Sequence, residues 1–364
     1  EDGGNFEYST QYHRLVLEMV IHMTILLEKK SFTVLTNKPL TNSSFIPEMY
    51  KKSNGHIEKL AKAICFTKAL QKKNGYVPQF GDNDSGRVFN ILPPESDKDH
   101  RHVVAVGESI FYGRLPGAAN NPWHDEALMF NTNSFYDKSY LTTKITDGEI
   151  YRYKNSGISI LKTNKLYFAF IEHNAGRGHA HNDLFSFELQ MMGRDFIVDG
   201  GSYCYTASPK LRKQFRSSFY HNTLCDFGHE QSLEAGLFEL FPMAFPAIEV
   251  VNNKCIRGCH DAYGLQHCRE FKVNNNSIII NDTYAGGGTC NLNLAPGVRW
   301  DKSLDGIILT NSNVSIKLTL VNFTDVKAVR GCYSRQYGVR EENELLVLSR
   351  SPGKTQLMFE CIDG

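Results

Sequence analysis

The second part of the chain alternates between short apolar segments and turn residues. Within many of these segments the hydrophobic side chains recur at every second position, which places them on one face of a β-strand. Glycine, asparagine, aspartate and serine separate the segments. Short strands at this spacing predict an antiparallel β-sandwich or barrel and not a series of βαβ units. The segments are GISILKT (157–163), KLYFAFIEH (165–173), FSFELQMM (185–192), DFIVDG (195–200), NSIIINDT (276–283), DGIILTN (305–311), SIKLTLVNF (315–323) and ELLVLSR (344–350).

The first third of the chain has the spacing of helices instead. Residues 6–30 are apolar on most faces, as in a helix that packs among other helices. Residues 44–75 contain a second helix that ends at an Asn-Gly pair, and residues 102–112 form a third. The stretch 113–148 shows little periodicity and reads as a linker. We therefore predict an α+β multidomain chain, with a helical part plus linker over 1–145 and an antiparallel β-sandwich over 146–364.

Composition excludes several classes of protein. Among 364 residues the formal net charge is only +1, so no overall field attracts nucleic acid. The longest apolar run, residues 15–27, is too short and too polar to span a membrane. Nine cysteines form an odd set without a disulfide-like spacing, which fits a reducing compartment or inert buried thiols.

The stretch GHAHNDLFSFEL (178–189) places two histidines at the mouth of a strand. Side chains at i and i+2 of an extended segment point to the same side, so His179 and His181 can converge. Asp199 ends a later strand, and His221 opens another. Together with His181 these residues make a chemically sensible zinc set with an open position, although residue type alone favours three polar residues at strand ends.

Several separated motifs, in the same order, resemble the heparinase II/III-type polysaccharide lyases, and in particular members found among bacterial surface-polysaccharide genes. The resemblance covers most of residues 1–235 and continues more weakly beyond. It is carried by EDGGNFEYSTQYHR (1–14), GDNDSGR (81–87), GRGHAHNDLFSFEL (176–189), FIVDGGSYCY (196–205), FRSSFYHNT (215–223) and, less strongly, CHDAYGLQHCREF (259–271).

The resemblance implies a partial (α/α) toroid followed by the β-sandwich, with a cleft between them. It implies cleavage of an acidic, uronic-acid-containing polysaccharide by β-elimination, which requires removal of a carbon-bound proton, neutralisation of the carboxylate and protonation of the leaving oxygen. It assigns proton transfer to Tyr12 and His179. By the same resemblance, one structural zinc ion is bound by His181, Asp199 and His221, and the cleft is lined by Tyr205, Arg212 and Arg216.

Other interpretations remain open from the sequence. A uronyl epimerase can remove the same proton, and a non-catalytic protein can bind acidic glycans with the same fold. Tyr12 on an apolar helix can be a core residue. The loop GDNDSG (81–86) fails the calcium-loop pattern and is expected to shape the cleft. The cysteines and histidines of 255–268 match no standard zinc spacing and suit a β-hairpin.

The family's carboxylate-neutralising asparagine lies upstream of the tyrosine motif, so the resemblance implies an N-terminally truncated sequence. We therefore expect an additional N-terminal helical segment that packs against the helix of 6–28. The cellular location of the protein stays open. The family resemblance favours the bacterial periplasm or secretion, and the odd cysteine count also allows the cytoplasm.

Overall fold

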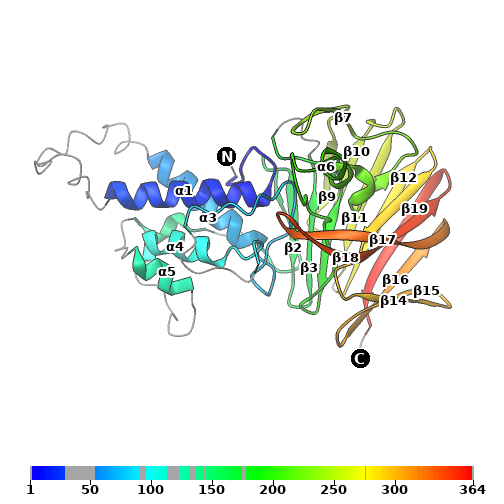
Figure 1. The fold of residues 1–364 in the computed structure, drawn as a ribbon. Helices are drawn as coiled ribbons and strands as arrows, with labels where there is room; N and C mark the ends of the chain where they lie inside the picture. Colours follow the sequence, from blue (N-terminus) through cyan, green and yellow to red (C-terminus); the bar gives the residue numbers. More distant parts are fainter. Residues whose placement is uncertain are drawn as a thin grey trace, which may run out of the picture.

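The computed structural model describes residues 2–28, 54–89, 96–112, 123–130, 136–142, 145–173, 178–274 and 276–362. Four described helices come first along the chain and lie on one side of the molecule, and the strands form stacked sheets on the other side, where the short helix α6 (Pro209–Arg216) also lies (Figure 1). All described strand pairs are antiparallel. The chain is thus mostly β, with a few helices before the sheets, and the toroid remains a proposal for the longer protein.

The helices α1 (Thr10–Glu28), α3 (Asn54–Leu70), α4 (Arg101–Tyr112) and α5 (Trp123–Met129) pack around one small apolar core. Ile21 of α1 and Ile64 of α3 are fully buried in it. Gly107 lets α4 approach both helices closely, because a Cβ atom there would lie 2.8 Å from Ile64 and 3.1 Å from Ile21. The close packing of this core therefore requires glycine at position 107 as well as the apolar side chains.

The helices predicted at 6–30, within 44–75 and at 102–112 correspond to α1, α3 and α4. Residues 44–53 lie outside the described residues. The prediction missed α5, which falls in the stretch interpreted as a linker, because seven residues are too few for a helical period to emerge.

Among the helices in the described ranges, none has both the length and the apolar character needed to cross a bilayer.

The strands form a five-stranded sheet (order β1-β2-β3-β4-β5), an eight-stranded sheet (β14-β15-β16-β19-β12-β11-β10-β9), a four-stranded sheet (β17-β18-β13-β6) and a two-stranded hairpin (β7-β8). The first sheet contains β1 Ile150–Tyr153, β2 Ile158–Lys162, β3 Leu166–Ile171, β4 Phe187–Met191 and β5 Arg194–Ile197. The second contains β9 Ala247–Asn252, β10 Cys255–His260, β11 His267–Val273, β12 Ser277–Tyr284, β14 Arg299–Ser303, β15 Gly306–Asn311, β16 Val314–Val321 and β19 Gly353–Cys361. The others contain β6 Leu224–Cys225, β13 Gly288–Asn293, β17 Phe323–Gln336, β18 Val339–Arg350, β7 Ser232–Ala235 and β8 Glu239–Pro242.

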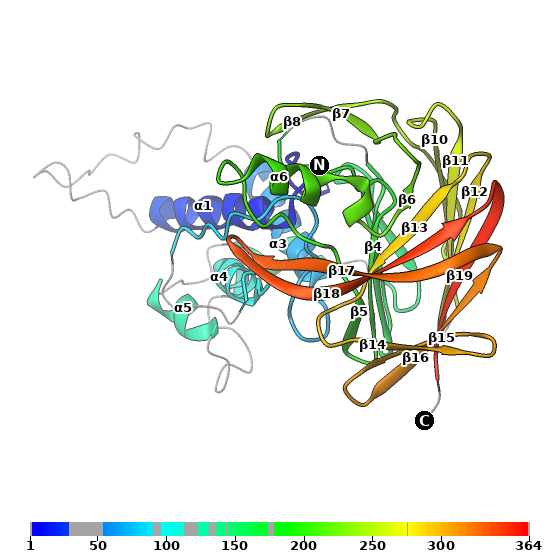
Figure 2. The same ribbon diagram turned by 45° about the vertical axis from the view of Figure 1, so that its right-hand side comes forward.

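The five-stranded sheet is the middle layer, between the helices and the eight-stranded sheet (Figure 2). Its central strand β3 is buried on both faces. Phe168 and Phe170 belong to the core shared with the large sheet, whereas Ala169 and Ile171 pack with Phe66 of α3. Alternate side chains therefore join two different cores, as the two-residue period of a strand requires.

A buried ion cluster joins the helical part to the middle sheet. The Lys72 ammonium, beyond the end of α3, lies 2.6 Å from Glu188 of β4 and 2.8 Å from Asp195 of β5. The backbone N–H of Gln79 donates to the same Glu188 carboxylate at 2.9 Å. These contacts fix the start of the segment that continues into the loop at 81–87, and so they position that loop against the sheets.

Candidate active site

The site forms where backbone segments far apart in the sequence meet. The N–H of Asp82 donates to the carbonyl of His179 at 2.8 Å, and the N–H of Thr10 donates to the carbonyl of Phe80 at 3.0 Å. Gly81 lies at this crossing with a φ of +70°, and a Cβ atom there would lie 2.7 Å from the His179 carbonyl oxygen. Only glycine fits both the conformation and the space. The loop 81–87 is thereby held against both His179 and the start of α1.

Tyr12 and His179, the predicted proton-transfer residues, are in direct contact. Ser9 caps α1, since its hydroxyl accepts from the N–H of Tyr12 at 3.1 Å and fixes the first turn of the helix. The phenol ring of Tyr12 stacks on the imidazole of His179. The His179 side chain is 19% exposed, so the pair lies at the molecular surface.

The Tyr12 hydroxyl group is bound on two sides. It donates to Asp84 Oδ2 at 3.0 Å, and its oxygen lies 3.3 Å from the hydroxyl oxygen of Tyr205. Burial, reinforced by the negative charge of Asp84, raises the pKa of Tyr12 well above its ordinary value. Tyr12 is therefore a protonated phenol at neutral pH.

Asp82 is the hub of the site, and its side chain is fully buried. Its carboxylate accepts hydrogen bonds from His179 Nδ1 at 3.1 Å and from His181 Nε2 at 2.8 Å. Both terminal nitrogens of the Arg212 guanidinium also bind it, one of them at 2.7 Å. Although burial acts to raise the pKa of Asp82, the two histidines and the charge of Arg212 hold it below its ordinary range. Asp82 is thus an ionised acceptor, so His179 Nδ1 donates to it, and in the neutral imidazole the lone pair is on Nε2.

The predicted substrate ligands surround this hub. Arg212 and Arg216 lie in α6 (Pro209–Arg216), and both are buried. Besides its bonds to Asp82, Arg212 lies over the ring of Tyr205, 4.9 Å from its centroid. Arg212 Nε and Arg216 Nη1 donate to the carbonyl of Leu237 at 3.0 and 2.9 Å. Both arginines therefore support the wall of the site, and a direct contact of either with substrate stays a prediction.

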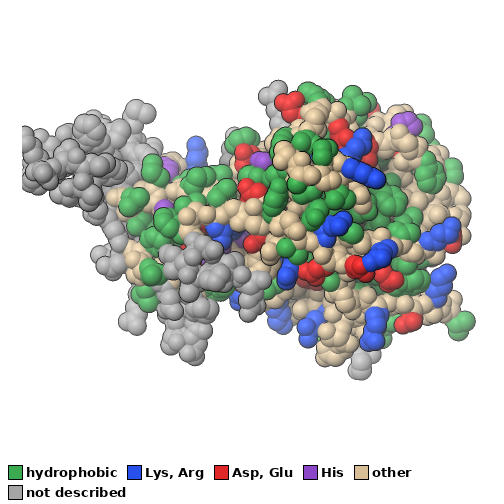
Figure 3. All heavy atoms as spheres, in the orientation of Figure 1, with side chains coloured by type: hydrophobic (Ala, Val, Ile, Leu, Met, Phe, Trp, Pro, Cys, Tyr) green, Lys and Arg blue, Asp and Glu red, His purple; other side chains and the backbone are tan. Residues whose placement is uncertain are grey.

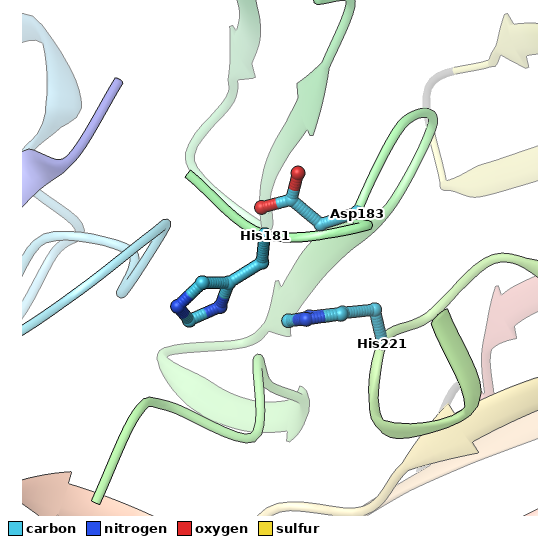
Figure 4. A group of neighbouring side chains, drawn as sticks. All are labelled: His181, Asp183 and His221. Carbon is cyan, nitrogen blue, oxygen red and sulfur yellow. The ribbon is translucent and has the colours of Figure 1, made fainter. Parts of the chain in front are cut away.

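Three buried ligand atoms close to these groups have no partner among the described residues. They are His181 Nδ1, Asp183 Oδ1 and His221 Nε2. One ligand atom from each of the three residues lies within 4.8 Å of the other two. Figure 4 shows the two imidazoles beside each other, with the Asp183 carboxyl group near them. Unpartnered buried polar atoms are costly, so a convergent set of this kind fits a ligand that all three can bind.

The arrangement differs from the predicted metal set in its carboxylate. Asp199 Oδ2 binds His221 Nδ1 at 2.8 Å, which leaves His221 Nε2 directed to the common point. Asp199 therefore lies behind His221, as carboxylates often do behind metal-binding histidines. Asp183 takes the third position in the group that the structure brings together. The assignment of Asp199 as a direct ligand remains a prediction.

The chemistry of this set fits a divalent metal. Two neutral imidazole nitrogens and one carboxylate are ligands that zinc accepts. Burial raises the pKa of Asp183 to about 7, and a bound cation would favour its ionised form. His181 Nε2 is already occupied by Asp82, which leaves Nδ1 for a metal.

Sequence reasoning missed the roles of Asp82, Asp84 and Asp183. The loop at 81–86 was expected to shape the cleft, but its two aspartates bind the predicted catalytic residues themselves. The sequence feature that could have indicated these roles is the pair Asp82 and Asp84, separated by one residue in a loop with glycine at both ends. Asp183 was visible too, because it follows His181 within the same motif.

The cysteine- and histidine-rich segment of 255–268 is a β-hairpin, as predicted. Cys259 of β10 faces Cys268 of β11, and the two form a disulfide. The sequence reasoning did not predict this pair. His260 and His267 lie beside it and bind each other at 3.1 Å. Within the described residues, the convergent metal-ligand group includes none of these side chains.

Comparison with known proteins identifies a matching family model and solved structures with the same fold. Residues 146–358 match the family model described as "Heparinase II/III-like, C-terminal". A heparinase III with methylated lysines superposes with a TM-score of 0.72 at 15% identity, covering 100% of this chain and 52% of that one. A heparan sulfate lyase from Pedobacter heparinus gives a TM-score of 0.65 at 17% identity, with 100% and 53% covered. The chain thus spans about half the length of these solved structures.

A search of curated proteins finds no match to this chain. The family model covers more than half of the chain, and the solved structures share its fold over the whole length. The chain therefore belongs to the heparinase II/III-like family.

Proposed function

We propose that the full-length protein is a polysaccharide lyase that cleaves a uronic-acid-containing polysaccharide by β-elimination. The observation that carries the proposal is the contact of His179 with Tyr12, in which an imidazole bound to Asp82 through Nδ1 stacks on a protonated phenol. Family membership supports the same reaction class. An elimination needs one group that removes a proton and one that supplies a proton, and this pair offers both.

His179 is the base in this proposal. Because Asp82 holds Nδ1, Nε2 is free to take the proton from the carbon beside the uronate carboxylate. Tyr12 is the acid, since its raised pKa keeps its hydroxyl protonated. As the carbon–oxygen bond breaks and the double bond forms, the Tyr12 proton passes to the leaving glycosidic oxygen. His179 gains one proton and Tyr12 loses one, so the step is balanced.

A divalent metal, zinc by ligand type, has a structural role here. Its ligands are His181 and His221, completed by the carboxylate of Asp183 or Asp199. Bound there, it supplies a fixed positive charge that ties these segments together. Because His181 also binds Asp82, the metal centre and His179 share one carboxylate, and the metal contributes to the placement of the base.

The group that neutralises the substrate carboxylate belongs to a further helical segment of the full-length protein. This segment packs on an apolar stripe of α1 formed by Met19, Met23 and Leu26, which are 45%, 56% and 53% exposed. Hydrophobic side chains gather on the side of the molecule where α1 lies (Figure 3). An exposed stripe at helical spacing is a packing surface. The greater length of the related structures supports the presence of such a segment.

Two other functions use the same site. A uronyl epimerase removes the same proton and returns it on the opposite face, in which case Tyr12 donates to carbon. A binding protein holds the acidic glycan without reaction. The position of the Tyr12 hydroxyl between Asp84 and Tyr205, close to the stacked His179 ring, favours an acid that acts together with the base.

A screen of the full-length protein against uronate polysaccharides separates the three functions. A lyase gives shorter chains with an unsaturated uronate that absorbs in the ultraviolet. An epimerase changes the uronate signals in nuclear magnetic resonance spectra without shortening the chain. Binding in a pull-down without either product identifies the third function and contradicts the proposal.

A further inference from the structure

Asp84 is the carboxylate nearest to the reacting proton of Tyr12 for which the proposed reaction gives no role. Its Oδ2 accepts the Tyr12 hydroxyl at 3.0 Å. Its side chain is partly exposed, whereas Asp82, two residues earlier, is fully buried and bound by His179, His181 and Arg212. Each aspartate of the loop therefore binds one member of the stacked pair.

The loop holds Asp84 in place through contacts that do not involve Tyr12. Asp84 Oδ1 accepts the N–H of Gly86 at 2.8 Å. The hydroxyl of Ser85 donates to Asp97 and accepts the N–H of Tyr337 at 2.9 Å, and Tyr337 lies at the tip of the β17–β18 hairpin. The backbone next to Asp84 is thus anchored through Ser85, while one oxygen of the Asp84 carboxylate binds Gly86 and the other binds Tyr12.

We propose that Asp84 is a positioning residue that acts only in the acid step, where it keeps the Tyr12 hydroxyl group protonated. This inference rests on the proposed lyase function. Between turnovers the carboxylate accepts the hydroxyl hydrogen bond and opposes ionisation of the phenol. After the leaving oxygen has taken the proton, Tyr12 is a phenolate that receives a hydrogen bond from Tyr205. A proton from water then passes through the Asp84 carboxyl group to the phenolate, while His179 releases its own proton to water.

If Asp84 acts only in the acid step, the effect of replacing it on turnover depends on the leaving group of the substrate. A glycosidic oxygen needs a proton as it departs, whereas fluoride leaves as a stable anion and needs none. A defect in acid catalysis therefore disappears when the substrate carries fluoride at the leaving position. A defect in folding or in the base persists with both substrates.

The test compares Asp84→Asn with the wild-type full-length protein on two uronate oligosaccharides that differ only in the leaving group, sugar or fluoride. The amide keeps an oxygen for Gly86 but cannot relay the proton. With the sugar leaving group we expect kcat to fall on the order of 100-fold, with KM changed less than about threefold. With fluoride we expect kcat within about threefold of wild type.

Asp97→Asn is the matched control, because Asp97 is a carboxylate that binds the same loop through Ser85 without touching Tyr12. We expect it to behave like wild type with both substrates, because the amide oxygen of asparagine can still accept the Ser85 hydroxyl and hold the loop. An Asp84→Asn variant that loses equal activity on both substrates, or none on the sugar substrate, overturns the inference while the lyase function stands. A wild-type protein that eliminates neither substrate contradicts the lyase function itself.

Discussion

The imidazole of His179 lies flat on the phenol ring of Tyr12, with centroids 3.4 Å apart and planes 8° from parallel. The two residues are 167 positions apart in the sequence, and one lies on a helix and the other in the segment before a strand. The loop at 81–87 binds both segments, and a hydrogen bond from the His179 N–H to the Glu7 carbonyl joins them directly. In the proposed β-elimination, the stacked contact places the base and the acid at one locus.

Removal of either functional group should abolish turnover while the fold persists. We expect Tyr12→Phe and His179→Ala each to lower kcat by on the order of 100-fold or more in the full-length protein. Tyr12→Phe keeps the stacked ring, so circular dichroism and thermal unfolding should match wild type. Near-normal turnover of either variant on the natural substrate would show that its assigned role is wrong.

Metal binding should require both histidines of the centre. Elemental analysis of wild-type protein should find about one divalent metal per chain, and His181→Ala or His221→Ala should lose it. Anomalous scattering should place the ion next to His181 Nδ1 and His221 Nε2 and show whether Asp183 or Asp199 completes the set. An ion that binds neither histidine, or crystals without any ion after zinc is supplied, would contradict the proposed centre.

Acid should destabilise the fold in part through His13. This side chain is 4% exposed, and its Nε2 lies 2.8 Å from the hydroxyl of Thr67. Burial lowers the pKa of His13 from 6.5 to about 4, so the folded state binds fewer protons than the unfolded state between these values. Stability contributed by the neutral side chain is complete above pH 6.5 and falls by about 1.4 kcal/mol per pH unit below it.

Urea unfolding between pH 7.5 and pH 4.5 measures this dependence. His13→Gln should reduce the slope by about one proton. An unchanged slope for His13→Gln would show that His13 is not held neutral in the folded state.

The Cys259–Cys268 disulfide should stabilise the β10–β11 hairpin. Seven of the nine cysteines lie outside the disulfide, so titration of the denatured protein should find seven thiols before reduction and nine after it. Loss of the crosslink in a Cys259→Ser, Cys268→Ser double variant should cost about 2 kcal/mol, because the bond closes a short loop. Nine thiols in protein purified without reductant would contradict the pairing.

The exposed stripe of α1 should behave as an interface. Met23→Glu should reduce aggregation of the protein comprising residues 1–364, because it removes exposed apolar surface. In the full-length protein the same change should lower the thermal midpoint by several degrees, since it buries a charge against the proposed segment. A neutral effect in the full-length protein would show that nothing packs there.

Much of the fold was predictable because it depends on local patterns. The alternation in 157–163 and 165–173 corresponds to β2 and β3, and the helical spacing in 6–30 corresponds to α1. The pairing of strands was not predictable: Ile280 of β12 faces Leu357 of β19, and no local signal joins positions so far apart. Long-range register depends on packing of the whole sheet.

Part of the site was likewise predictable from local sequence, and part of it was not. Tyr12 and His179 were identified through motifs, which carry residue types in order. Asp82 binds His179 across 97 positions, and Asp84 binds Tyr12 across 72. Such partners are recognised only when the backbone has brought them together. Asp183 was missed for a different reason: it lies two residues after His181 in the sequence, but the direction of its side chain depends on the turn that follows.

The most direct test of the β-elimination mechanism is mass spectrometry, with ultraviolet absorbance, of products from a uronate polysaccharide treated with the full-length protein. The mechanism predicts oligosaccharides that end in an unsaturated uronate and absorb in the ultraviolet, formed by wild type and lost in both Tyr12→Phe and His179→Ala. Products that have gained the elements of water and do not absorb would identify a hydrolase and contradict the mechanism.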